Sequence, residues 1–283
     1  MSTENMQAIE QESQAKEDQK YLKRLKLLWP AAELGGGFQK AYFSTYVNYL
    51  YTNVYQFSVF FSGILSIVQT ILTWVGAPLF GTFLDRFSFK KGTFWPWIII
   101  GTSIIYGAWI LLFSIPALGV DASNMAVVAL ILALFISACT PLMAQPIVSV
   151  YPRMSTNPAD RQYFAMAQKI GRDGGKTVFG YVVPWLLALF MAITSESNAY
   201  AFTAIIIGVL AMSFYWALAF FGLRGSYVER NAMAEKRNRD GSAKKNIPLS
   251  RVLKTLFTNR PLLAMFLFFS GHKIYYFLQY TTA

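Results

Sequence analysis

Long apolar runs, separated by short polar segments, dominate this chain of 283 residues. A helix needs about 20 mainly apolar residues to cross the hydrocarbon core of a bilayer. Six runs reach this length, and a seventh begins near the end of the sequence. They cover residues 28–51, 57–84, 94–118, 125–150, 164–193 and 200–223, and the seventh opens at Pro261. The pattern predicts an all-α membrane protein built around a bundle of six transmembrane helices.

The charged residues are few and lie mostly in the polar segments. They make up 14% of the chain, compared with about 25% in a soluble domain. A net charge of +11 first suggests nucleic-acid binding, but 20 of the 25 Lys and Arg residues lie in segments on the same side of the predicted bundle. Membrane proteins retain positive charge on one side in this way, so we expect no nucleic-acid partner and a lipid bilayer instead.

The distribution of basic residues also predicts the orientation of the chain. They occur in the polar tail and in the segments after the second, fourth and sixth runs, whereas the loops 52–56, 119–124 and 194–198 contain no Lys or Arg. Because cytoplasmic loops are enriched in Lys and Arg, we expect a multi-pass protein of the plasma (inner) membrane with a cytoplasmic N-terminus. The first 20 residues are polar and lack the features of a signal peptide, and they are expected to form a disordered cytoplasmic tail.

Several short motifs resemble a known family. Residues 92–101 read Gly-Thr-Phe-Trp-Pro-Trp-Ile-Ile-Ile-Gly, and segment 81–92 before them contains Asp85-Arg86 and Lys90-Lys91. Further similarities are residues 77–81, Gln145-Pro146, and Tyr151-Pro152 followed by Asp160-Arg161. In order and spacing these pieces resemble the glycoside–pentoside–hexuronide:cation symporters, the melibiose-carrier family of the major-facilitator fold. The resemblance covers residues 28–283 and implies a sugar or glycoside as substrate, with Na⁺, Li⁺ or H⁺ as the coupling ion.

The resemblance also implies a domain organisation, since major-facilitator transporters consist of two six-helix halves with the solute site between them. Residues 1–27 are then a cytoplasmic tail, 28–223 the N-terminal bundle, 224–260 a basic cytoplasmic linker and 261–283 the truncated start of the C-terminal bundle. We expect a fragment that lacks its C-terminal half and does not transport alone. Apolar residues at helical spacing over 249–257 predict an amphipathic helix, either on the membrane surface or beneath the bundle.

Some positions depart from the pattern of the family. The melibiose-carrier type has two acidic residues in its second helix that bind the coupling cation, and these positions are Thr73 and Ala77 here. An acidic residue of the fourth helix is replaced by Ala144, and the acidic sugar-binding position of the first helix falls within the glycines 35–37. A basic position of the fifth helix is retained as Lys169. These departures remove the carboxylates that the usual sodium site and the usual sugar site would use.

Charged residues inside the runs are the candidate functional residues, because ionisable groups are costly to place in a bilayer. The fifth run has Lys169, Arg172, Asp173 and Lys176 at a spacing that puts most of them on one helical face. One interpretation is a polar substrate site facing a water-filled cavity, with Lys40 of the first run across from it. The other is an internal ion-pair network, in which Asp173 balances Arg172 or Lys169 and holds helices together.

Two sets of residues follow for the transport site. The candidate substrate ligands are Lys169, Arg172, Lys40, Tyr42, Tyr46 and Asn48. Aromatic faces flanked by polar groups suit sugars, although an interfacial aromatic belt is an equally good explanation of the tyrosines. Asp173 and Thr73 are the candidates for ion coupling, and no cofactor other than a coupling H⁺ or Na⁺ is expected.

Glycines and loop charges add two structural expectations. The fifth run contains glycines that let another helix or a ligand approach its backbone closely, at positions 171, 174, 175 and 180. Asp85 and Arg86, at the end of the second run, are candidates for a conformational latch between the two halves, and a solvated loop is the alternative.

The sequence supports transport over the other functions of membrane proteins. A seven-helix receptor or sensor would place its N-terminus outside, against the charge distribution. An enzyme or a metal site is not expected, because the chain has one histidine and one cysteine, and Asp173 has no acidic neighbour. We expect a secondary transporter of a sugar or glycoside that works by alternating access. The alternative substrate is an acidic sugar such as a hexuronide, proton-coupled through Asp173 or uncoupled, because the charge within the runs is mainly positive.

Overall fold

The computed structural model describes residues 3–87, 89, 92–119, 121–241, 258–261, 264 and 268. The chain divides into two units, residues 1–235 and 236–283, and the description below concerns the first of them. The amphipathic helix predicted for 249–257 lies outside the described residues, as does nearly all of the predicted seventh helix.

Over the described residues the chain is almost entirely helical. The α-helices are α1 (Thr3–Gln39), α2 (Thr45–Tyr49), α3 (Val59–Arg86), α4 (Trp95–Ser114), α5 (Ala122–Val150), α6 (Pro158–Ile193), α7 (Glu196–Ala217) and α8 (Tyr227–Gly241). Short helical turns of other kinds join or extend them: η1 (Lys40–Ser44), η2 (Leu50–Val54), η3 (Ile115–Leu118), η4 (Tyr151–Arg153) and η5 (Leu218–Leu223). The fold class is therefore the one that the apolar runs predict.

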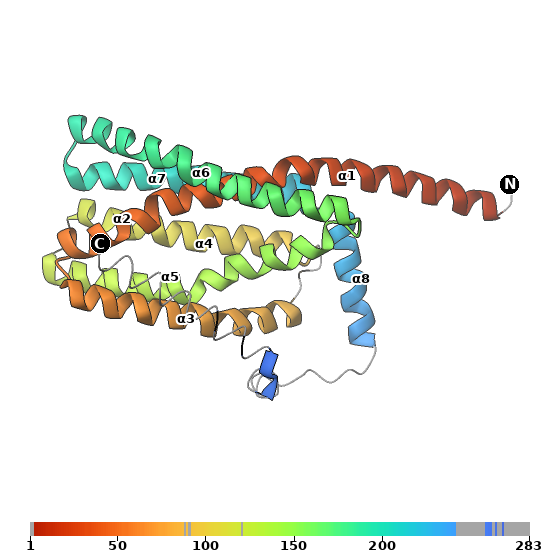
Figure 1. Cartoon of the computed structure of the whole chain (residues 1–283), viewed down its shortest axis with the longest axis horizontal. Coiled ribbons are helices and arrows are strands. Elements are labelled where there is room, and N and C mark those ends of the chain that lie inside the picture. Colours follow the sequence, from red (N-terminus) through yellow and green to blue (C-terminus); the bar gives the residue numbers. More distant parts are fainter. Residues whose placement is uncertain are drawn as a thin grey trace. The chain divides into compact units, whose positions relative to one another are not determined.

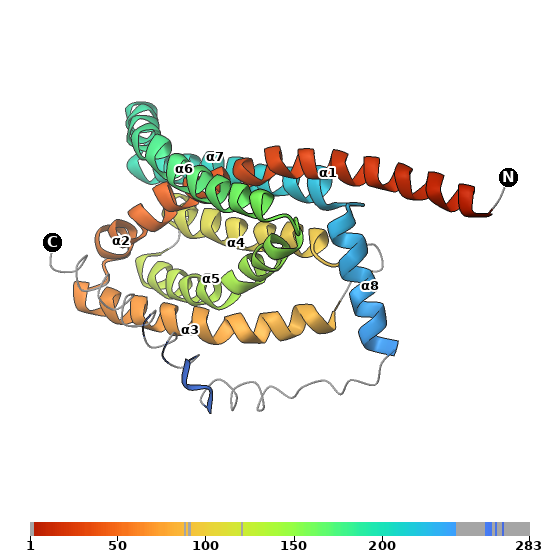
Figure 2. The same ribbon diagram turned by 45° about the vertical axis from the view of Figure 1, so that its right-hand side comes forward.

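The long helices pack along one another as a bundle (Figures 1 and 2). α1 packs against α6 and α7, α4 lies against α5 and α7, and α3 packs against α5. Large aromatic side chains fill the interior, among them Trp29, Tyr42, Phe43, Tyr106 and Phe113. These side chains come from α1, η1 and α4, so the interior is built mainly around these elements.

Five of the described helical segments are long and apolar enough to cross a membrane, and they begin at Val59, Trp95, Asn124, Pro158 and Glu196. Many of their apolar side chains point away from the protein, most conspicuously along α3, where Val59 and Phe60 are 76% and 80% exposed. Outward-facing apolar residues of this density are expected against lipid rather than water. The first predicted run, 28–51, is not among the five, because it contains Glu33, Gln39, Lys40 and Asn48 and is less apolar than the others.

The tail is helical, contrary to the expectation of disorder. Residues 3–27 form the first part of α1, which extends beyond the other helices (Figure 1). The segment is rich in Ala, Glu, Gln, Lys and Leu, which favour helix. It contains no proline or glycine, and the first in the chain is Pro30. An ion pair one turn apart, between Lys16 and Glu12 at 2.8 Å, adds to this preference. Low hydrophobicity was therefore a poor indicator of disorder here.

Glycines bring the backbones of α1 and α6 into direct contact, as the sequence predicts. A Cβ atom added to Gly171 would lie 2.5 Å from the carbonyl oxygen of Pro30, and one added to Gly175 would lie 2.5 Å from that of Leu34. From the other side, a Cβ on Gly37 would lie 2.5 Å from the carbonyl oxygen of Arg172. Gly174 and Gly180 have open space instead, so only part of the glycine set serves helix packing.

Gly171→Ala is expected to destabilise the protein by about 2 kcal/mol, because the new methyl group meets backbone that cannot move aside. Gly174→Ala is the matched control on the same helix. It removes a glycine without any steric conflict and should leave stability unchanged or raise it by up to about 1 kcal/mol. Thermal unfolding of the purified protein in detergent measures both. Equal melting temperatures for the two variants would contradict the close α1–α6 contact.

Candidate substrate and coupling site

A buried ion pair joins α1 to α6 at the centre of the candidate site. Both the Nε and the Nη2 atoms of Arg172 donate to Oε2 of Glu33, at 2.9 and 2.6 Å, and Nε2 of Gln168 donates to Oε1 at 2.9 Å. The Glu33 side chain is 1% exposed and that of Arg172 is 38% exposed. The carboxylate is thus satisfied on both oxygens, while the guanidinium still reaches the surface of the bundle.

This pair changes the charge balance that the sequence suggests. Arg172 was a candidate substrate ligand, and its alternative partner was Asp173 on the same helix. Its observed partner is Glu33, on a helix 139 positions earlier in the chain. A paired Arg172 contributes little net positive charge to the surrounding space, so the site is less basic than a count of residues indicates.

Next to the pair, α6 presents an exposed polar face. Lys169, Asp173 and Lys176 are all exposed. A shallow, open cavity of about 520 Å³ lies along this face beyond Lys169, lined by Asp173, Lys176, Thr177, Gly180 and Tyr181 of α6. The space has one acidic group, one basic group, a hydroxyl and an aromatic ring. Groups of these kinds match the donors, acceptors and C–H faces of a sugar.

The candidates in the first segment separate into different environments. Lys40 is exposed on η1, a turn that packs against α6. Tyr42 is fully buried, and its hydroxyl donates to the carbonyl oxygen of Tyr200 at 2.7 Å. Tyr46 is half-buried, with its ring beside those of Tyr42 and Tyr200, and Asn48 is exposed on α2. The structure therefore brings Lys40 near the α6 face and gives Tyr42 a packing position.

Thr73 lies in a contact between two helices. Its hydroxyl is 2.9 Å from the carbonyl oxygen of Gln69 one turn earlier on α3, and 3.0 Å from that of Ser137 on α5. The same contact includes Gly76, whose added Cβ would lie 2.9 Å from the carbonyl oxygen of Ala138. Thr73 thus places its hydroxyl at the α3–α5 contact.

The candidate latch residues Asp85 and Arg86 end α3, and their side chains lie outside the described part of the chain. At the neighbouring start of α4, the carboxylate that binds backbone N–H groups belongs to Glu229 of α8. Its carboxylate accepts backbone N–H bonds from Thr93 (2.6 Å), Phe94 (2.8 Å) and Trp95 (2.7 Å). Burial raises the pKa of Glu229, and the three N–H bonds act in the opposite direction.

Sequence reasoning overlooked Glu229, although a signal for it exists. Ser226-Tyr227-Val228-Glu229 has the spacing of a capping box, in which the glutamate reaches back to its own helix. In the structure Ser226 does lie at the start of α8, with its hydroxyl 3.5 Å from the N–H of Glu229. The glutamate, however, reaches across to the free N–H groups that begin α4, where a negative charge also meets the positive end of the helix dipole.

Other polar contacts hold the same end of the bundle together. Lys26 pairs with Asp160 at 2.7 Å, and Arg230 of α8 bonds to Glu17 and Asp18 of α1. Arg224 lies over the ring of Trp95, with its guanidinium carbon 5.4 Å from the ring centre. The basic segments predicted to share one side of the membrane are thus connected in the structure.

Comparison with known proteins places this arrangement among transporters. The chain is 25% identical to an isoprimeverose transporter of Lactiplantibacillus pentosus over 223 residues, which are 77% of this chain and 43% of that protein. It is also 25% identical to the uncharacterized symporter YnaJ of Bacillus subtilis (strain 168) over 230 residues, 80% of this chain and 46% of that protein. The chain thus spans less than half of the length of either relative. Residues 30–283 match the family described as MFS/sugar transport protein, and the chain belongs to that family.

Proposed function

We propose that this chain provides the N-terminal six-helix bundle of a secondary sugar transporter that works by alternating access. The observation that carries the proposal is the exposed polar face of α6, with its open cavity of about 520 Å³ on the same helix as Arg172 of the Glu33–Arg172 pair. Polar groups on a helix of a membrane protein are stable where they face water or a solute. The named functions of the two relatives, an isoprimeverose transporter and a symporter, agree with this proposal.

The charge of the site favours a neutral sugar or glycoside as the solute. Glu33 neutralises Arg172, and Asp173 lies between Lys169 and Lys176 on the exposed face. An acidic sugar such as a hexuronide is the second candidate, because the exposed groups there still include two lysines. Asp173 is the candidate proton-binding or cation-binding group, since Thr73 offers only a hydroxyl, whereas hard cations prefer carboxylate and other strong oxygen ligands.

Lys169→Ala is expected to weaken sugar binding about tenfold, which is the loss of roughly one charge-assisted hydrogen bond. Ile170→Ala, at the neighbouring exposed position, is the control and should bind like the wild type. Binding is measured by isothermal titration on the purified protein, with neutral and acidic monosaccharides and disaccharides, with and without Na⁺. Na⁺-dependent binding of a neutral sugar that Lys169→Ala leaves unchanged would refute the α6 site, and preference for an acidic sugar would select the second candidate.

The orientation of the bundle is the second part of the proposal, with the charged tail and α8 in the cytoplasm. In a Cys139→Ser background, Asp121→Cys is expected to react with a membrane-impermeant maleimide added to intact cells. Arg237→Cys, on α8, should react only after the membrane is permeabilised. Labelling of Arg237→Cys in intact cells would reverse the assignment.

A further inference from the structure

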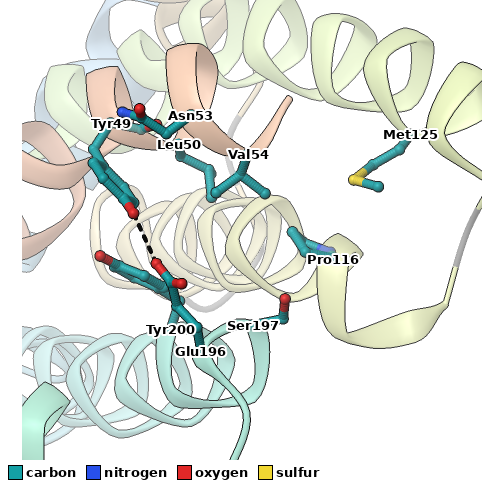
Figure 3. Close-up of a pocket in the computed structure, with 9 residues that line it drawn as sticks. All are labelled: Tyr49, Leu50, Asn53, Val54, Pro116, Met125, Glu196, Ser197 and Tyr200. Atoms are coloured by element: carbon teal, nitrogen blue, oxygen red, sulfur yellow. Dashed lines mark hydrogen bonds between the residues drawn. The ribbon is translucent and has the colours of Figure 1, made fainter. Parts of the chain in front are cut away.

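A second cavity lies at the opposite end of the bundle from α8. It has a volume of about 330 Å³ and is separate from the cavity on α6. α7, which begins at Glu196 beside this cavity and leads toward α8, spans about 33 Å at about 1.5 Å per residue. The walls come from α2, η2, η3, α5 and the first turn of α7 (Figure 3). Five helical elements, of which α2 and η2 are consecutive in the chain, therefore converge on it.

The polar wall of this outer cavity is held in a defined geometry. The hydroxyl of Tyr49 donates to Oε1 of Glu196 at 2.7 Å, and the rings of Tyr49 and Tyr200 stack with centres 5.6 Å apart at 26° (Figure 3). The hydroxyl of Tyr42 donates to the carbonyl oxygen of Tyr200 and so holds the backbone of Tyr200 in place. The bond to Tyr49 uses one of the two carboxylate oxygens of Glu196, so Oε2 is open to a ligand.

The geometry points to a binding site for one neutral sugar ring in this outer cavity, in addition to the α6 site proposed above. Glu196 supplies strong acceptors for sugar hydroxyls, and Asn53 offers both a donor and an acceptor. The edge of the Tyr49–Tyr200 stack and the apolar side chains of Leu50 and Pro116 suit the C–H face of a pyranose. A volume at the lower end of ligand sites, which span about 300–1,000 Å³, fits a single ring better than a disaccharide.

The chemistry of the wall argues against other small ligands. Among the described residues that line the cavity there is no Lys or Arg and the one charged group is Glu196, so an anionic solute is disfavoured. A small organic cation would need aromatic faces turned toward it. Here the rings of Tyr49 and Tyr200 stack on each other, which uses one face of each ring, and Tyr49 occupies Oε1 of Glu196, so the wall offers a cation less than a full aromatic cage. The inference depends on the proposed function only for the class of ligand, because the residues of the two sites do not overlap.

The test uses Ser197→Cys, in the wall of the cavity, in a Cys139→Ser background of the purified chain in detergent. Reaction with a maleimide is followed by mass spectrometry, with methyl glucoside, D-xylose or choline added. We expect methyl glucoside or D-xylose to slow the reaction about tenfold at saturation, and Asp121→Cys, outside the cavity at the same end, to be unaffected. Glu196→Gln should raise the half-protecting concentration about tenfold, through loss of a charged acceptor. Asn53→Ala, an exposed position, should raise it as well.

The decisive combination adds Lys169→Ala to the labelling variant. Protection that persists in this background supports a separate outer site, even if the α6 site proves wrong. Protection that disappears with Lys169→Ala would show that the sugar acts from the α6 site, and would overturn the inference. Absence of protection by either sugar, or protection by choline alone, would overturn it too. The Tyr49–Glu196 hydrogen bond would then serve only to connect two helix ends.

Discussion

Glu33→Gln is expected to lower the free energy of unfolding by about 3 kcal/mol, because it leaves Arg172 partly buried without its counter-charge. Loss of one partner of a buried ion pair lowers stability over a range of values, and we expect the lower end of that range here. The reason is that 38% of the Arg172 side chain is exposed and reaches a polar environment. For a protein of this size the change corresponds to a fall of about 6–12 °C in melting temperature. Thermal unfolding in detergent measures it.

The double variant Glu33→Gln with Arg172→Gln distinguishes a pair from two separate contributions. Removing both charges eliminates the uncompensated group, so the double variant should be more stable than the sum of the single losses predicts, by at least about 1 kcal/mol. Strictly additive losses would mean that the two side chains do not act as an ion pair. Lys169→Gln, which removes an exposed charge on the same helix, is the control and should change stability little.

Glu229→Ala is expected to have the other large effect, a loss of about 3 kcal/mol or more. The change strands three N–H groups at the start of α4, at Thr93, Phe94 and Trp95, each of which costs about 1–3 kcal/mol when buried without an acceptor. Water that enters the space left by the side chain would offset part of this. The melting temperature should fall by about 10 °C.

The same helix offers a control for this prediction. Glu235 pairs with Arg153 at 3.2 Å, and its side chain is 56% exposed. Exposed pairs of this kind contribute less than about 1 kcal/mol, so Glu235→Ala should melt within about 3 °C of the wild type. If both glutamate variants melt alike, the carboxylate of Glu229 is not acting as the cap of α4.

The helices of the bundle could be predicted from the sequence because local signals mark both their interiors and their ends. When the turns η3 and η5 are counted with α4 and α7, the apolar runs predict α3 to α7 to within four residues, apart from α6, which begins six residues before its run. Helix-starting residues agree with the observed ends: Ser58 caps α3, Asn157 caps α6 and Ser195 caps α7 through side-chain bonds to the following turn. Periodicity and capping are properties of neighbouring residues, which a single sequence displays.

The candidate site could be predicted only in part, because its interactions join residues far apart in the chain. The charges of α6 indicate a polar face, but nothing near Arg172 in the sequence shows that Glu33 of α1 is its partner. Asp173 is the nearer carboxylate in sequence, although adjacent residues of one helix do not face each other. The contact of Glu229 with α4 is of the same long-range kind, and it replaces the role expected from a local capping box.

The two π turns in the first segment have a consequence for how its sequence can vary. η1 and η2 lie on either side of the short helix α2, and each turn of this kind holds one residue more than an α-helical turn. One residue corresponds to about 100° of rotation around an α-helix. Of the two turns, only η1 lies among Tyr42, Tyr46 and Tyr49, and all three tyrosines still contact Tyr200. Such turns also tolerate changes in chain length, because the gain or loss of one residue there shifts only the local register. The same change within α4 would rotate a buried face out of the bundle.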